Sequence, residues 1–260
     1  MSVASLTASG SFGGVLVAET RSELLKALRL PVFIIPTLVF PAMFYVLFGI
    51  VLGGGAPGGI TMPAYMLATY GTFGVVGAAL FGMGVGVAAE RGQGWLTLKS
   101  ATPMPPLAYF GAKVLMSMVL GLLIFALLAV LSVTVGGVRL PASSWGAMAL
   151  VLTLGTIPFC ALGCALGYMT GPNSAPAIAN MIYLPMSLLS GLWIPLEFMP
   201  GVVRSIAPFM PPYHIARLAL GSIGMDARVT FHVAALAACT VLFLGAAVLA
   251  YRRDDGRTWG

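Results

Sequence analysis

Long apolar stretches separated by short polar interruptions make up most of this chain. Residues 31–89 and 140–196 contain no charged side chain, and further apolar runs cover 114–138 and 229–251. A helix needs about 20 apolar residues to cross the hydrocarbon core of a bilayer, so each of the two longer runs should hold two spans. The pattern therefore predicts an all-α integral membrane domain over 31–251, with six transmembrane helices at about 31–53, 63–88, 114–136, 145–168, 176–194 and 229–251.

An amphipathic helix is predicted directly before the first span, in residues 14–29. One face of this helix carries Val17, Leu24, Leu25 and Leu28, and the other carries Glu19, Ser22, Glu23, Lys26 and Arg29. Because a membrane segment follows at once, we expect the helix to lie flat on the cytoplasmic surface of the bilayer, with an ordinary solvated helix as the alternative. The chain starts without a basic region followed by an apolar stretch and a cleavage site, so no signal peptide is predicted and residues 1–30 form a cytoplasmic N-terminal region.

The segment between the fifth and sixth spans stays apolar but cannot form one continuous helix. Residues 195–228 include Pro195, Pro200, Pro208, Pro211 and Pro212, and proline removes a backbone donor and clashes with the preceding helical turn. Irregular backbone at membrane depth persists only where protein or a water-filled cavity satisfies it. We therefore expect short re-entrant helices that dip into the membrane from the outer side and form a gate or the roof of a cavity.

The composition excludes a soluble domain. Of the 260 residues, 59% are hydrophobic and 8% are charged, whereas charged residues make up about a quarter of soluble domains. The net charge of +6 does not indicate a nucleic-acid partner, because the basic residues lie beside span ends and not on one clustered face. Most of them fall on the side that holds both termini, so this side, including the tail 252–260, is predicted to be cytoplasmic.

The chain lacks the residues that would supply energy or catalysis. Ion-coupled carriers usually place ionisable groups inside the bilayer, but the predicted spans have none at their centres. There is no G-x-x-x-x-G-K-[ST] phosphate loop and no recognisable catalytic set. Cys160, Cys164 and Cys239 lie in spans with no acid or histidine nearby to complete a zinc site, so they are interpreted as packing residues. We expect a non-enzymatic chain that binds no cofactor or metal itself and forms part of a motor-driven transporter.

The first strongly polar interruption after the second span is predicted to be a cytoplasmic loop. It covers 90–106 and should contain a short helix around Trp95 to Ser100 that stops before Pro103. A loop that merely anchors two spans is the alternative interpretation.

Two stretches resemble a known family. The run Pro185, Ser190-Gly191, Pro195, Met199-Pro200, Pro208 and Pro212-Tyr213 resembles the end of the fifth helix and the outer re-entrant region of ABC-2-type permeases. These are the membrane subunits of ATP-driven exporters. The loop 90–106 resembles their coupling loop, although Gln93 stands where a second Glu is often found. The resemblance covers nearly the whole chain. It implies a permease pair, expected to be a homodimer, in the bacterial inner membrane, with two separate ATP-binding cassette subunits that hold ATP and Mg.

The resemblance also assigns roles to residues. For coupling to the ATPase it points to Glu90, Arg91, Trp95 and Lys99. The substrate path on spans one, two and five would use Phe40, Phe44, Phe73, Asn180, Tyr183 and Met186. For these aromatic residues, lipid contact or core packing is the alternative. The outer gate would use Leu189, Ser190, Gly191, Trp193 and Glu197.

The apolar walls of such a path favour a hydrophobic or amphipathic cargo, either a drug-like molecule or a lipid. The sequence LSGLWIPLEFMP resembles drug and antibiotic exporters more closely than polysaccharide exporters. Export of a lipid-linked glycan or of ions, an ATP-independent carrier and a non-transporting membrane assembly subunit are the alternatives. The sequence leaves open the cargo, the partner ATPase and whether the second permease is identical.

Overall fold

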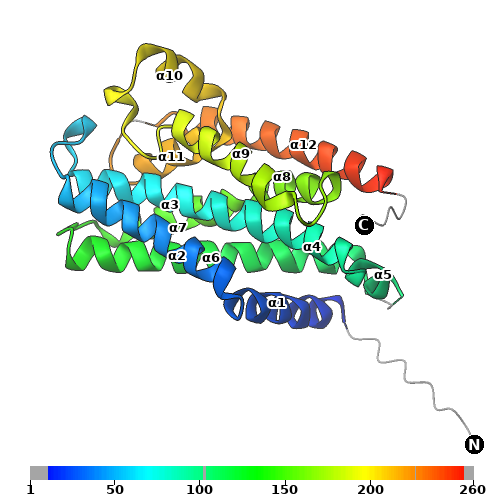
Figure 1. Ribbon diagram of the computed structural model, residues 1–260. Coiled ribbons are helices and arrows are strands. Elements are labelled where there is room, and N and C mark those ends of the chain that lie inside the picture. Colours follow the sequence, from blue (N-terminus) through cyan, green and yellow to red (C-terminus); the bar gives the residue numbers. More distant parts are fainter. Residues whose placement is uncertain (1–10, 102–103, 226, 255–260) are drawn as a thin grey trace, which may run out of the picture.

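The described residues, 11–101, 104–225 and 227–254 of a computed structural model, form a bundle of helices that contains no β-strand (Figure 1). The longer helices lie side by side. They are α1 (Phe12–Leu28), α2 (Pro31–Phe44) continued by the π-helix η1 (Tyr45–Val51), α3 (Met62–Leu80), α6 (Pro106–Thr134), α7 (Ala142–Leu154), α8 (Thr156–Met169), α9 (Ala175–Leu189) and α12 (Val229–Arg253). We call the end of the bundle that carries α1 and the short helix α5 (Trp95–Ser100) the α5 end, and the opposite end the α10 end.

Five segments of the described chain, not the expected six, are long and apolar enough to cross a membrane. They are Pro31–Val51, Met62–Gly92, Pro106–Thr134, Ala142–Met169 and Val229–Arg253. The predicted fifth span corresponds to α9, which is apolar but has only 15 residues. At 1.5 Å per residue α9 is about 22 Å long, shorter than the hydrocarbon core of about 30 Å. The helix ends because Gly191 adopts the left-handed conformation, with φ of 72°.

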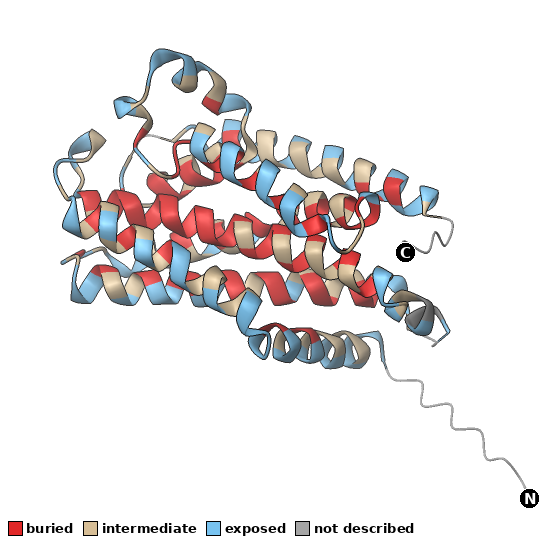
Figure 2. Ribbon diagram, viewed as in Figure 1, coloured by how far each residue is buried: buried red, intermediate tan, exposed pale blue. Residues whose placement is uncertain are grey.

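The helix of Met62–Gly92 forms the centre of the bundle. It consists of α3, the π-helix η3 (Phe81–Val85) and α4 (Gly86–Gly92). In its most apolar stretch 72% of the residues are buried, against 11% in α12, and Figure 2 shows this contrast between centre and periphery. Glycine allows the close approach to α8, since a methyl group on Gly84 would lie 3.0 Å from the carbonyl oxygen of Gly163.

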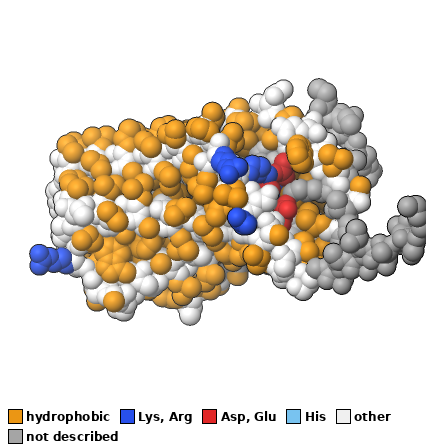
Figure 3. Space-filling model, turned by 90° about the horizontal axis from the view of Figure 1, so that it is seen from below, with side chains coloured by type: hydrophobic (Ala, Val, Ile, Leu, Met, Phe, Trp, Pro, Cys, Tyr) orange, Lys and Arg blue, Asp and Glu red, His pale blue; other side chains and the backbone are white. Residues whose placement is uncertain are grey.

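Apolar side chains cover the sides of the bundle. The surface seen in Figure 3 is largely hydrophobic. Most of the charged side chains in this view gather to the right of its centre, and one basic side chain protrudes at the opposite end. Large exposed residues such as Val32, Val130 and Val241 lie on α2, α6 and α12. Such a surface is stable against lipid and unfavourable in water, so the fold is that of an integral membrane protein.

Short helices connect α9 to α12, as the prolines predict. They are η4 (Leu196–Phe198), α10 (Gly201–Ile206), η5 (Ala207–Phe209) and α11 (Pro211–Gly221). Pro195 and Pro200 stand directly before helices, while Pro208 and Pro211 occupy the first turns, where a missing backbone donor does no harm.

The helix α1 differs from the predicted amphipathic arrangement. Glu23, assigned to the polar outer face, is buried together with Ala27 where α1 packs on α6. Val17, Leu25 and Leu28, on the predicted apolar face, are exposed. The assignment of Glu23 was wrong because its carboxylate is held by a lysine inside the bundle.

Candidate functional site

A largely buried group of charged side chains, with one tyrosine and the half-exposed Lys26, connects three helices at the α5 end. This ion cluster consists of Glu23 and Lys26 of α1, Glu90 of α4, and Tyr109 and Lys113 of α6. The Lys113 ammonium lies 2.6 Å from Glu23 Oε2 and 3.0 Å from Glu90 Oε1. The Tyr109 hydroxyl donates to Glu90 Oε2 at 2.5 Å. Lys26 Nζ contacts Glu90 and also lies 2.6 Å from Glu23 Oε1, so two ammonium groups balance two carboxylates.

Because the ion cluster is largely buried, its stability depends on each charge keeping its partner. The side chains of Lys113 and Glu23 are only 1% and 3% exposed, and a buried charge that loses its partner destabilises a protein by about 3–5 kcal/mol. Burial lowers the pKa of Lys26, but its hydrogen bonds to Glu23 and Glu90 outweigh burial and keep the pKa above its usual 10.5. The ion pairs of Lys113 with Glu23 and Glu90 hold α1, α4 and α6 in one arrangement.

Arg91 fastens the same end of the bundle to α8 and α12. Its Nε and Nη2 lie 2.9 Å and 2.5 Å from the two carboxylate oxygens of Asp254, in a bidentate pair. Its Nη1 donates to the carbonyl oxygens of Gly167 and Thr170, at 2.6 Å and 3.3 Å, where α8 ends. The guanidinium also lies 5.2 Å from the centre of the Tyr168 ring. One side chain thus joins the ends of three helices.

The predicted loop helix follows immediately and exposes apolar side chains. The chain turns at Gly94, with φ of 74°, and forms α5 over the predicted residues. Trp95 is 52% exposed and Leu98 is 64% exposed, whereas Leu96 packs against the core. The side chain of Lys99 and the predicted stop at Pro103 lie outside the described residues. Of the predicted coupling residues, Glu90 and Arg91 therefore point into the bundle and Trp95 points out.

A second group of side chains, nearer the α10 end, is aromatic. This aromatic cluster consists of Phe44 of α2, Phe48 of η1, Tyr70 and Phe73 of α3, Tyr183 of α9, and Trp193 in the turn after α9. Trp193 stacks on Phe44, with ring centres 5.9 Å apart, and meets Phe73 edge-on at 6.1 Å. Phe73 stacks on Tyr183 at 4.8 Å. Such pairs each contribute about 0.5–1.5 kcal/mol beyond simple burial.

Two hydrogen bonds fix the polar atoms of the aromatic cluster. The Tyr70 hydroxyl donates to the carbonyl oxygen of Trp193 at 3.0 Å, and the Tyr183 hydroxyl donates to that of Phe73 at 2.8 Å. Both bonds connect α3 with α9 or with the turn after it. The aromatic cluster thereby closes the space between α2, α3 and α9.

The structure brings together only some of the residues predicted for the substrate path. Phe44, Phe73 and Tyr183 belong to the aromatic cluster, and the half-exposed Phe40 lies beside it, 6.4 Å from the Phe44 ring centre. Asn180 is exposed on α9 and Met186 is buried. Sequence analysis missed Phe48 and Tyr70, although both lie one helical turn from a predicted residue, Phe44 and Phe73 respectively.

The predicted gate residues lie where α9 ends. Ser190 is buried, and its hydroxyl donates to the Met186 carbonyl oxygen at 2.6 Å. Leu189 is half-buried, Gly191 forms the left-handed turn, and Trp193 joins the aromatic cluster. Glu197 is exposed in η4. Their role as a gate stays a prediction.

Comparison with known proteins assigns the chain to a family. Residues 15–223 match the ABC-2 type transporter family. This range includes most of α1, the ion cluster, α5 and the aromatic cluster. The chain is also 29% identical to the protein named "Putative transport permease YvfS" of Bacillus subtilis (strain 168) over 200 residues, which are 77% of this chain and 82% of that protein. The chain therefore belongs to the ABC-2 type transporter family, whose members are transport permeases of the membrane.

Proposed function

We propose that this chain is the permease subunit of an ABC exporter, which moves a hydrophobic or amphipathic cargo such as a drug-like molecule or lipid. A separate ATP-binding cassette subunit would bind ATP and Mg and hydrolyse ATP. The observation that carries this proposal is the position of α5. It presents two exposed apolar side chains directly after two residues, Glu90 and Arg91, that are anchored inside the bundle.

Docking of the ATPase would use the exposed face of α5. Trp95 and Leu98 offer an aromatic and an aliphatic anchor, the kind of side chain that dominates protein interfaces. Glu90 and Arg91 would act differently from their predicted role as contact residues. They would position α5. Through their ion pairs they would transmit a displacement of α5 to α1, α6, α8 and α12.

The central helix connects α5 with the aromatic cluster. Glu90 and Tyr70 belong to the same helical segment, Met62–Gly92. A tilt of this segment at the α5 end would therefore move Tyr70 and Phe73 against Phe44 and Trp193. We propose that the bundle has two discrete packings. In one of them these rings are separated and the path between α2 and α9 is open.

The proposed assembly is a homodimer of permeases with two ATPase subunits in the cell membrane. The α5 end would face the cytoplasm, together with both termini. The helix α9 and the turn after it would form the fifth of six spans, and η4 to α11 would form the outer re-entrant region. The exposed Val17, Leu25 and Leu28 of α1 would lie against the lipid interface.

ATP turnover of the complex tests the proposal. The chain would be co-expressed with an ATP-binding cassette subunit, purified, and placed in lipid nanodiscs. We expect Trp95→Ala combined with Leu98→Ala to abolish co-purification, because both anchors are lost. The matched control is Leu107→Ala at the start of α6, a residue that is 76% exposed but lies outside α5. Equal loss in the control, or unchanged binding in the double variant, would refute docking at α5.

Cargo-stimulated ATP turnover separates an exporter from its alternatives. A screen of amphipathic drugs, lipids and lipid-linked glycans on the wild-type complex identifies the cargo class. Docking without stimulation or transport of any cargo would favour a non-transporting assembly subunit.

A further inference from the structure

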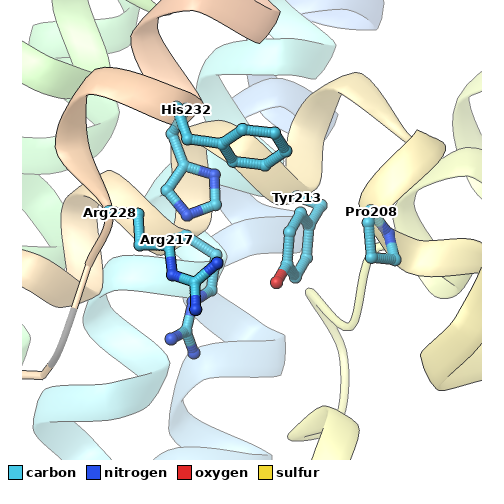
Figure 4. A pocket seen from close by; sticks show the side chains of 6 residues that line it. Pro208, Tyr213, Arg217, Arg228 and His232 are labelled. Atoms are coloured by element: carbon cyan, nitrogen blue, oxygen red, sulfur yellow. The ribbon is translucent and has the colours of Figure 1, made fainter.

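A charged cavity lies at the α10 end, where α11 meets α12. It has a volume of about 330 Å³ and is lined by Pro208, Tyr213, Arg217, Arg228, Phe231 and His232. Figure 4 shows Arg217 and Arg228 beside the His232 ring and the Tyr213 hydroxyl near them. None of these residues belongs to the ion cluster or to the aromatic cluster, so the proposed function leaves the cavity unexplained.

Two basic side chains reach the cavity. Two guanidinium groups line it, and none of its described lining residues is an acid. An anion bound in the cavity would be attracted by both guanidinium groups. Arg217 is also engaged in other contacts of the fold, whereas Arg228 is exposed at the start of α12. Asp226, the nearest acid in sequence, lies outside the described residues.

A pair of buried histidines lies next to the cavity and joins the two helices that carry it. His214 of α11 and His232 of α12 are buried, with 2.8 Å between their Nδ1 atoms. At this distance one Nδ1 donates a hydrogen to the other, so the pair holds α11 to α12. The two arginines are therefore carried by elements whose relative position is fixed.

An apolar surface continues from the cavity along α12. Phe231 lines the cavity and is 55% exposed, and Leu242 and Leu249, which share its face of the helix, are exposed further along. A ligand that fits both features has an anionic head and a hydrocarbon tail. A free anion would use only the cavity.

We propose that this cavity binds the phosphate group of an anionic phospholipid. The guanidinium groups of Arg217 and Arg228 match phosphate oxygens in bidentate geometry, and the Tyr213 hydroxyl can donate a further hydrogen bond. The acyl chains would lie on the exposed side of α12. The lipid would thereby brace α12 against α11 independently of the cargo and of the ATPase.

Binding of a short-chain lipid to the purified full chain tests this site. The probe is dioctanoyl-phosphatidylglycerol, which carries a net negative charge, compared with dioctanoyl-phosphatidylcholine and with inorganic phosphate. Affinity is measured by native mass spectrometry, and gel filtration confirms that each variant is folded. We expect Arg228→Gln and Arg217→Gln each to weaken binding of phosphatidylglycerol by about tenfold, because each removes a charge-assisted hydrogen bond.

A matched control removes the same charge outside the cavity. Arg204 is exposed on α10 at the same end of the molecule and does not line the cavity, so Arg204→Gln should bind like the wild type. Wild-type affinity in Arg228→Gln, the exposed position least able to affect folding, would overturn the site. Equal loss in Arg204→Gln or equal binding of phosphatidylcholine would overturn it as well. Inorganic phosphate binding as tightly as phosphatidylglycerol would show a site for a free anion and overturn the lipid assignment.

Discussion

The ion cluster at the α5 end and the aromatic cluster nearer the α10 end both hold the central segment Met62–Gly92, but against different helices and by different means. At the α5 end, α1, α4 and α6 meet through buried charges whose oxygen and nitrogen atoms are 2.6 to 3.0 Å apart. In the aromatic cluster, α2, α3 and α9 meet through rings whose centres are 4.8 to 6.4 Å apart. A buried charge destabilises the fold when it is separated from its partner. Aromatic rings can shift over one another with little loss of contact energy.

This difference indicates where the bundle can move. Separating a buried ion pair costs about 3–5 kcal/mol, while each aromatic pair contributes about 0.5–1.5 kcal/mol. A force applied at α5 should therefore leave the α5 end intact and repack the aromatic cluster.

Removal of Lys113 should have the largest effect. Lys113→Met leaves Glu23 and Glu90 with Lys26 alone, so we expect a loss of about 3–5 kcal/mol of stability. Thermal unfolding followed by fluorescence-detected gel filtration measures the change. Arg21→Met on the exposed side of α1 is the control. If the two variants unfold at the same temperature, the ion cluster does not stabilise the α5 end.

Arg91→Lys should have the next largest effect. Lysine keeps the charge but cannot form the two-pronged pair with Asp254 or reach both carbonyl oxygens as well, so about 1.5–3 kcal/mol should be lost. Asp254→Asn should act similarly. The double variant should lose less than the sum, and simple additivity would show that the two residues do not act together.

Tyr70→Phe should destabilise the fold only slightly but alter function. It keeps the ring and removes the hydrogen bond to the Trp193 carbonyl oxygen, a loss of about 1 kcal/mol. If the aromatic cluster is the part that opens, basal ATP turnover of the complex should rise because the closed packing is weakened. Tyr109→Phe, in the ion cluster, is the control and should not raise turnover.

Acid should weaken the contact between α11 and α12, with the smallest effect. Burial lowers the pKa of His214 below its usual 6.5, and a backbone hydrogen bond with Pro208 opposes this only in part. Stability from the neutral form is therefore present above pH 6.5 and is lost as the pH falls further, by at most about 1.4 kcal/mol per pH unit. The melting temperature should fall between pH 7.5 and 5.5, and His214→Gln should reduce this fall. A wild-type melting temperature that rises in acid would contradict the sign.

The sequence predicts the helical membrane fold because hydrophobicity along the chain is a local property. The same property does not determine the length of α9. The apolar run 176–194 is long enough to span, but apolarity does not report the left-handed turn at Gly191 that ends the helix at Leu189. The exposed α5 was predictable because Gly94 and Trp95 follow directly after a charged helix end.

The ion cluster could not be predicted from periodicity. Residues 23, 90 and 113 are far apart in sequence, and a helical wheel assigns Glu23 to solvent by polarity alone. A signal was nevertheless present in Lys113, which lies eight residues into the apolar helix α6 and requires a partner there. The aromatic cluster was predicted in part, since residue type identified Phe44, Phe73 and Tyr183 and only packing identified Tyr70.

Fluorine NMR of the four tryptophans tests most directly whether the aromatic cluster opens while the rest of the bundle holds. The chain would be labelled with 5-fluorotryptophan, with signals assigned by Trp→Phe variants, and studied in complex with the ATPase with and without a non-hydrolysable ATP analogue. Trp145, which contacts Phe125 between α6 and α7, is the internal reference. We predict that the nucleotide shifts the Trp193 signal and leaves that of Trp145 in place. An unchanged Trp193 signal, while Trp95 responds to docking, would contradict the account.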